Sequence, residues 1–204
     1  TPPIALQRCL DLVHEMAEKV SYAMKASIDM LDNYNKETAE EIRTVEDLAD
    51  HYEDIIGTYL VKLSLRKVSD GDSAVITKLL KLIGDFERIS DHGMNLKDSA
   101  KEMQEKEMHF SSKADKELEI FLDAVKEILD MSIDAFETNN TDEASKVEPL
   151  EEVIDDINTV VKANHIKRLQ KGKCTIEQGF VLSDISMNLE RVSDHCSNIA
   201  ISVI

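Results

Sequence analysis

Apolar residues recur every three or four positions along nearly the whole chain, and no segment alternates with the period of two that marks a β-strand. The first such stripe runs from Ala5 to Leu31 and stops near residues 33–35. Only six Gly and three Pro interrupt the 204 residues. This pattern predicts an all-α protein made of long amphipathic helices.

Polar segments divide the rest of the first half into two more helices. Thr38 and Glu41 have the spacing of a capping box, so a second helix is expected to start there and to continue to about Val68. The Ser- and Asp-rich segment 69–73 has the composition of a turn. A third helix is expected after it, ending near residue 106.

The second half repeats this division. A fourth helix is expected from residue 111 or 112 to 139–140, and a fifth over 142–170, with Pro149 close to its start. Thr175 and Gln178 form a second capping box, which predicts the start of a sixth helix. Short connections make neighbouring helices antiparallel, so the chain predicts two tandem antiparallel three-helix bundles, residues 1–108 and 109–204.

A twelve-residue segment occurs twice, at 84–95 and at 187–198. The two copies are identical at six positions, and all six are polar: Glu, Arg, Ser, Asp, His and Asn. The apolar positions only stay apolar, as Ile89 and Val192 do. A repeat maintained for packing alone would show the opposite preference, so the polar residues of the segment are the candidates for function.

Each copy places a Glu four residues before an Asp, which puts two carboxylates one turn apart on the same helix face. Similar pairs occur on the preceding helices, where the register leaves open whether Glu151 and Asp155 or Glu148 and Glu152 form the second pair; the first choice also aligns the apolar residues. The eight candidate metal ligands are Glu46, Asp50, Glu87, Asp91, Glu151, Asp155, Glu190 and Asp194.

Two facing pairs would offer four oxygen donors to a hard or intermediate cation such as Mg, Ca, Mn, Fe or Zn. The alternative is that Arg88, Arg191 and nearby lysines neutralise the carboxylates in surface ion pairs. His92 and His195 point about 100° away from the adjacent Asp, so hydrogen bonding between helices is favoured over metal ligation for them.

Composition narrows the function classes. The 41 Asp and Glu residues against 24 Lys and Arg give a formal net charge of −17, which argues against nucleic acid as a partner. Three cysteines without a CxxC spacing predict no disulfide framework and a reducing compartment. The chain has no apolar run of membrane-spanning length, and its start at Thr1 without Met suggests a piece of a longer protein.

The repeated motif and its surroundings resemble the PhoU family, and within it the PhoU-like domain that follows the membrane part of bacterial sodium/phosphate cotransporter-type proteins. The resemblance covers nearly the whole chain. It rests on segments 1–6, 46–50, 59–60, 85–92, 148–155, 165–169, 172–174 and 188–200. Ser90 and Ser193 depart from the family pattern, which commonly has Gly or Ala before the motif Asp.

The resemblance implies a non-catalytic regulator on the cytoplasmic side of the inner membrane, with a membrane phosphate transporter domain of the same polypeptide as its partner. It also implies that the Glu- or Asp-x-x-x-Asp pairs hold metal, with iron the metal associated with the family. The alternatives are a helical scaffold that docks a partner without metal, and a di-iron carboxylate enzyme. No Glu lies three residues before any His, which argues against the enzyme. A homodimer stays open.

Overall fold

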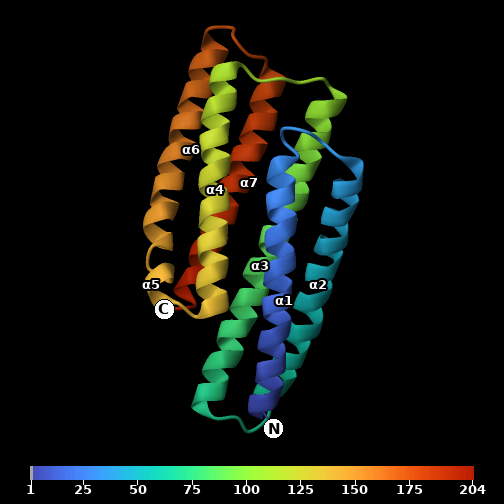
Figure 1. Ribbon diagram of the computed structural model, residues 1–204, viewed down its shortest axis with the longest axis vertical. Coiled ribbons are helices and arrows are strands. Elements are labelled where there is room, and N and C mark those ends of the chain that lie inside the picture. The colour runs from blue at the N-terminus through green and yellow to red at the C-terminus, as the bar shows by residue number, and fades with distance from the viewer. Residues whose placement is uncertain (1) are drawn as a thin grey trace.

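The computed structural model describes residues 2–204, and every regular element in that range is a helix. The helices are α1 (Pro2–Asp29), α2 (Lys36–Ser64), α3 (Asp70–Glu105), α4 (Ser112–Thr138), the short α5 (Thr141–Ala144), α6 (Val147–Gln170) and α7 (Ile176–Ile201). Figure 1 shows α1–α3 as one bundle and α4, α6 and α7 as a second bundle beside it. The predicted all-α fold with an internal repeat is confirmed.

The two bundles share a continuous apolar core. The longest helix, α3, contacts α1 and α2 in its own bundle and α7 in the other, and α1 also contacts α4. Phe86 of α3 and Phe136 of α4 are both buried, with ring centroids 5.6 Å apart. The methionines Met16 and Met24 are buried in the same core, as expected for apolar filler. Aromatic packing therefore joins the halves as well as filling each one.

Several helix ends differ from the sequence-based expectations. The capping box at Thr38 and Glu41 is wrong, because α2 begins earlier, at Lys36. Asn35 is its cap, and the Asn35 Oδ1 atom accepts from the Thr38 backbone N–H at 2.9 Å. The helix also ends at Ser64, four residues before the expected Val68. An Asn cap satisfies the same free N–H groups as a Ser or Thr cap, so the pattern alone did not separate them.

The expected turn at 69–73 is also wrong, since α3 already begins at Asp70, with the Ser69 side chain capping the Asp72 backbone N–H. The expected fifth helix is broken at residues 145–146 into α5 and α6. Pro149 is the third residue of α6, where its missing N–H leaves no helical bond unmade. The capping box of Thr175 and Gln178 is confirmed at the start of α7.

Segment 106–111 links α3 to α4, and the division of the chain between residues 108 and 109 stays a prediction. Thr1, the first residue of the expected first bundle, lies outside the described residues. Among the helices of residues 2–204, none combines the length and apolar character needed to cross a membrane.

Candidate functional site

A carboxylate cluster lies between α2 and α3 of the first bundle. Asp50 and Glu53 are three residues apart on α2 and therefore share a face, which lies against Glu87 of α3. One carboxylate oxygen from each of these three residues lies within 4.8 Å of the other two. The Glu87 side chain is only 12% exposed, so this group has little water to stabilise its charge.

The cluster makes the charged form of Glu87 unfavourable. Burial raises the pKa of the Glu87 carboxyl group to about 7, and a hydrogen bond with Asp91 and the charges of Asp91 and Glu53 act in the same direction. Burial also raises the pKa of Glu46, followed by the charges of Asp47, Asp91 and Asp50. The four residues predicted from this half therefore lie near one another, with Glu46 facing Asp91 and Glu87 facing Glu53.

A second cluster lies between α6 and α7, where Glu151, Asp155 and Asp194 each bring one carboxylate oxygen within 4.8 Å of the others. Burial raises the pKa of Glu151, and the charges of Asp155 and Asp194 raise it further. Burial likewise raises the pKa of Asp194. The favoured register, with Glu151 and Asp155 as the pair, brings these carboxylates to α7. Glu190 is not a member of this group of three, although its charge also raises the pKa of Asp194; its Oε2 lies 3.6 Å from Lys162 Nζ.

Glu53 is the member that the sequence did not single out. The predicted ligands come from positions that are acidic in both halves, and the position equivalent to Glu53 in the second half is Asn158. Identity between the two copies cannot point to a residue that differs between them. Its spacing was the available signal, because Glu53 lies three residues after Asp50 and seven after Glu46, on the same helix face.

Ion pairs with arginine accompany both clusters, as the alternative interpretation expected. Arg88 lies 3.5 Å from both Glu87 and Asp91, and Arg191 lies 3.6 Å from Asp194. Both arginine side chains are more than 60% exposed, at 63% and 62%, so solvent weakens these pairs. Arg88 does lower the pKa of Glu87, but burial and the neighbouring carboxylates outweigh it.

The repeated His and Asn residues serve the contact between bundles. His92 Nδ1 lies 2.8 Å from Asn188 Oδ1, and Asn95 Nδ2 donates to the same oxygen at 3.0 Å. Because an amide oxygen only accepts, the His92 hydrogen is on Nδ1. Asn188 is held in this orientation by its own bond to the Asp184 carbonyl oxygen.

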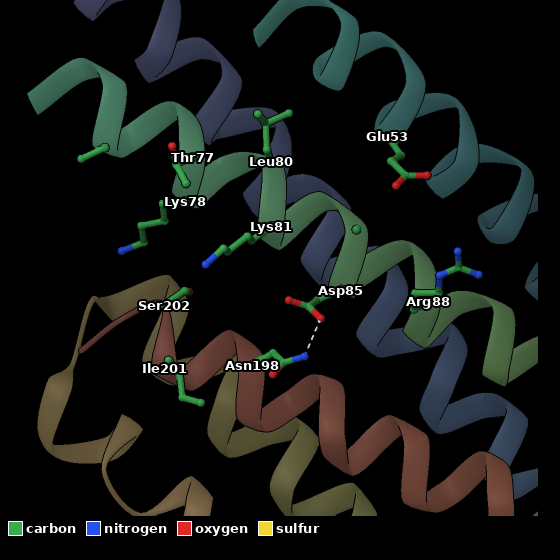
Figure 2. A pocket seen from close by; sticks show the side chains of 12 residues that line it. Glu53, Thr77, Lys78, Leu80, Lys81, Asp85, Arg88, Asn198, Ile201 and Ser202 are labelled. Atoms are coloured by element: carbon green, nitrogen blue, oxygen red, sulfur yellow. Dashed lines mark hydrogen bonds between the residues drawn. The ribbon is translucent and has the colours of Figure 1, made fainter. Parts of the chain in front are cut away.

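The second copy makes the same contact in the opposite direction. His195 Nδ1 lies 2.9 Å from Asp85 Oδ1, and Asn198 Nδ2 donates to that oxygen at 3.1 Å. Figure 2 shows the Asn198–Asp85 bond between α3 and α7, among the side chains that line an open groove of about 930 Å³; Lys78 and Lys81 also line it. The expected role of His92 and His195 in hydrogen bonding between helices is confirmed.

The carboxylate clusters have the donor chemistry of a site for a hard cation. In each cluster three carboxylates converge, and burial raises the pKa of Glu87 in the first and those of Glu151 and Asp194 in the second. The positive charge of the neighbouring Arg88 and Arg191 is exposed and weakened by solvent. A divalent ion supplies positive charge and replaces protons on the ligands. Asp50, Glu53 and Glu87 in the first bundle and Glu151, Asp155 and Asp194 in the second therefore fit a metal. As ligands, these residues and the other predicted ones, Glu46, Asp91 and Glu190, stay predictions.

Comparison with known proteins identifies the architecture. The family model described as the PhoU domain matches residues 13–100 and again residues 118–203. The chain belongs to the PhoU family. The two matches lie one in each bundle, so the family unit is one three-helix half of this fold.

Relatives and solved structures extend over nearly the full chain. It is 25% identical over 194 residues to the phosphate-specific transport system accessory protein PhoU homolog 1 of Thermotoga maritima, covering 94% of this chain and 82% of the relative. The PhoU homolog of Aquifex aeolicus is also 25% identical, over 91% of this chain and 83% of its own length. Crystal structures of PhoU from Pseudomonas aeruginosa and Streptococcus pneumoniae match with TM-scores of 0.86 and 0.84, covering 100% of this chain and 95% of theirs, at 22% and 19% identity. These structures show the same fold.

Proposed function

We propose that this PhoU-family chain is a non-catalytic regulator of phosphate uptake that acts on the cytoplasmic side of an inner-membrane phosphate transporter. The observation that carries the proposal is the family match in both bundles, together with relatives named as accessory proteins of phosphate-specific transport. A sodium/phosphate cotransporter domain in the same polypeptide is the partner that the sequence resemblance favours. The acidic surface, with a net charge of −17, fits a protein partner better than nucleic acid.

The test is phosphate influx in cells that carry the parent transporter with and without this chain. We expect the chain to restrain influx when external phosphate is plentiful, so its deletion should raise uptake there. Restoration of the wild-type chain should reverse the effect. Equal influx with and without the chain, over a range of phosphate concentrations, would contradict a regulatory role.

We further propose that the two clusters bind divalent metal, with iron or manganese as the first ions to test. The Glu87 carboxyl group, with its raised pKa, gains the most from a neighbouring cation. Asp50 and Glu53 would complete the ligands in the first bundle, with Asp91 hydrogen-bonded to Glu87 beside them, and Glu151, Asp155 and Asp194 would form the ligands in the second. In this role the ion would relieve carboxylate repulsion and hold α2 to α3 and α6 to α7.

Metal removal tests this second proposal. We expect EDTA to lower the melting temperature of metal-loaded protein and added Mn²⁺ or Fe²⁺ to raise that of the stripped protein, since binding at 100 times Kd adds about 2.7 kcal/mol of stability. Glu87→Gln and Asp194→Asn should reduce the shift, while the exposed Glu40→Gln should not. If no metal co-purifies and no added metal shifts the melting temperature, the metal proposal is contradicted and the helical scaffold without metal is supported.

A further inference from the structure

A cavity of about 220 Å³ lies between α6 and α7, beyond the carboxylate cluster of the second bundle. Its walls are made by residues one or two turns apart on each helix. The residues that matter here are Lys162, His165 and Ile166 of α6 and Gly179, Ser183 and Ser186 of α7. This volume is about that of seven water molecules in liquid water. It admits a small ion with some of its hydrating water and is too small for a nucleotide or a peptide.

The first bundle has apolar side chains at the equivalent positions. The repeat aligns Ser186 with Ile83 and Gly179 with Ile76, and the alignment of Asp155 with Asp50 places His165 opposite Leu60. All three first-bundle residues are buried, with exposures of 2%, 3% and 0% for Ile83, Ile76 and Leu60. The second bundle therefore has the polar side chains of His165 and Ser186 where the first bundle has a buried apolar contact, although the fold requires no polar residues there.

Two polar atoms at this contact have no hydrogen-bond partner among the described residues. Ser186 is 1% exposed, and its Oγ is unpaired; the Nε2 atom of His165 is also buried and unpaired. A buried polar atom without a partner is unfavourable compared with the apolar residue of the other half. Gly179 permits the arrangement, because a Cβ at this position would lie 2.7 Å from His165 Nε2.

These side chains together offer hydrogen-bond donors and one positive charge. Burial lowers the pKa of His165, and the charge of Arg168 lowers it further, so the imidazole ring is neutral at pH 7. Its Nδ1 lies 3.9 Å from Cys174 Sγ. A neutral ring has its hydrogen on either Nδ1 or Nε2; when the Cys174 thiol donates to Nδ1, the hydrogen is on Nε2, the unpaired atom. Lys162 adds an ammonium group, which lies 3.6 Å from Glu190.

We propose that this cavity binds a small oxyanion of the size of phosphate, held by Lys162, the His165 Nε2–H group and the hydroxyl groups of Ser186 and Ser183. A carboxylate-lined site would repel such a ligand, whereas ammonium, imidazole N–H and hydroxyl groups are the donors that bind oxyanions. The proposal goes beyond the regulatory role above, because it gives the chain a direct ligand and does not depend on a transporter or on metal.

The experiment is a titration of the purified, metal-stripped chain with inorganic phosphate, and in parallel with sulfate and acetate. We expect a saturable, one-site binding curve by calorimetry, accompanied by shifts of the His165 ring signals in NMR spectra. The variants Ser186→Ile and His165→Leu introduce the residues of the first bundle. They should fold with an equal or higher melting temperature and bind the anion at least tenfold more weakly.

Lys81→Gln is the matched control, because Lys81 is a cation at the separate α3–α7 groove and should leave binding unchanged. The proposal is overturned if none of the three anions binds saturably, if Ser186→Ile binds as tightly as the wild type, or if only Lys81→Gln loses binding. Because binding is measured on the isolated chain, its failure is separable from a failure of the uptake experiment.

Discussion

The carboxyl group of Glu87 is buried beside Asp91 and Glu53, so the folded metal-free protein binds a proton there more tightly than the unfolded chain does. Its pKa rises from an ordinary 4.5 to about 7. A group whose pKa is higher in the folded state stabilises the fold at pH values below its unfolded pKa, and this contribution is lost as the pH rises through the folded pKa. Glu87 therefore favours the metal-free fold at acidic pH.

The pH dependence of stability tests this statement. Between pH 5 and pH 8 we expect the unfolding free energy of the metal-free protein to fall by roughly 1 to 2.5 kcal/mol from this group, the upper end being the loss that a folded-state pKa of about 7 gives over this pH range. Glu87→Gln should remove most of that fall, and Glu40→Gln should not. Urea unfolding in EDTA at both pH values measures it. A pH profile that Glu87→Gln leaves unchanged would show that Glu87 ionises normally.

At the scale of elements, hydrogen bonds at the helix ends decided the boundaries. Asn35, Ser69, Ser111 and Thr175 each accept a hydrogen bond from the backbone N–H three residues later. The periodic apolar pattern places the middle of each helix well, because burial depends on several turns together. It places the ends less well, since one cap residue decides each end and several residue types can cap.

The start of α2 gives a direct test of this distinction. Asn35→Ala should lower the unfolding free energy by about 1 kcal/mol, because the Thr38 backbone N–H loses its partner. Thr38→Ala should change stability by less than about 0.5 kcal/mol, since this side chain is not the cap. Chemical denaturation of both variants measures the difference. A larger loss of stability for Thr38→Ala than for Asn35→Ala would instead support the capping box of Thr38 and Glu41.

At the scale of the whole molecule, the two bundles are joined by the apolar core and by two opposed hydrogen-bond pairs across α3 and α7. Each motif Asp of the carboxylate clusters, Asp91 or Asp194, directly precedes a His that bonds to the other bundle. The residues next to each cluster therefore also hold the contact between bundles. The acceptors differ, because Asp85 is a carboxylate and its repeat equivalent Asn188 is an amide.

A double-mutant cycle measures this contact. We expect His92→Ala and Asn188→Ala to destabilise the protein non-additively, with a coupling energy of about 0.5 to 1.5 kcal/mol. The exposed His51→Ala, combined with Asn188→Ala, should be additive within about 0.5 kcal/mol. Additive effects of His92→Ala and Asn188→Ala would mean that the bond between the bundles contributes nothing measurable to stability.

The sequence by itself determined the helical class, the repeat and the polar residues of the repeated segment, because periodicity and identity are local properties of the chain. Those signals gave eight candidate ligands, of which five, Asp50, Glu87, Glu151, Asp155 and Asp194, lie in the two carboxylate clusters; their role as metal ligands stays a prediction. They missed Glu53, whose equivalent Asn158 carries no charge, and the polar residues around Ser186, whose equivalents are apolar. Comparison of the halves emphasises what they share.

The tertiary structure decided what depends on distance between helices. Only the packing of α2 on α3 brings Glu53 to Glu87, and only the antiparallel contact of α3 with α7 gives His92 its partner Asn188. Burial then sets the pKa of Glu87 and leaves Ser186 Oγ without a partner. Desolvation and pairing both depend on neighbours far apart in the chain, and the sequence pattern carries no record of them.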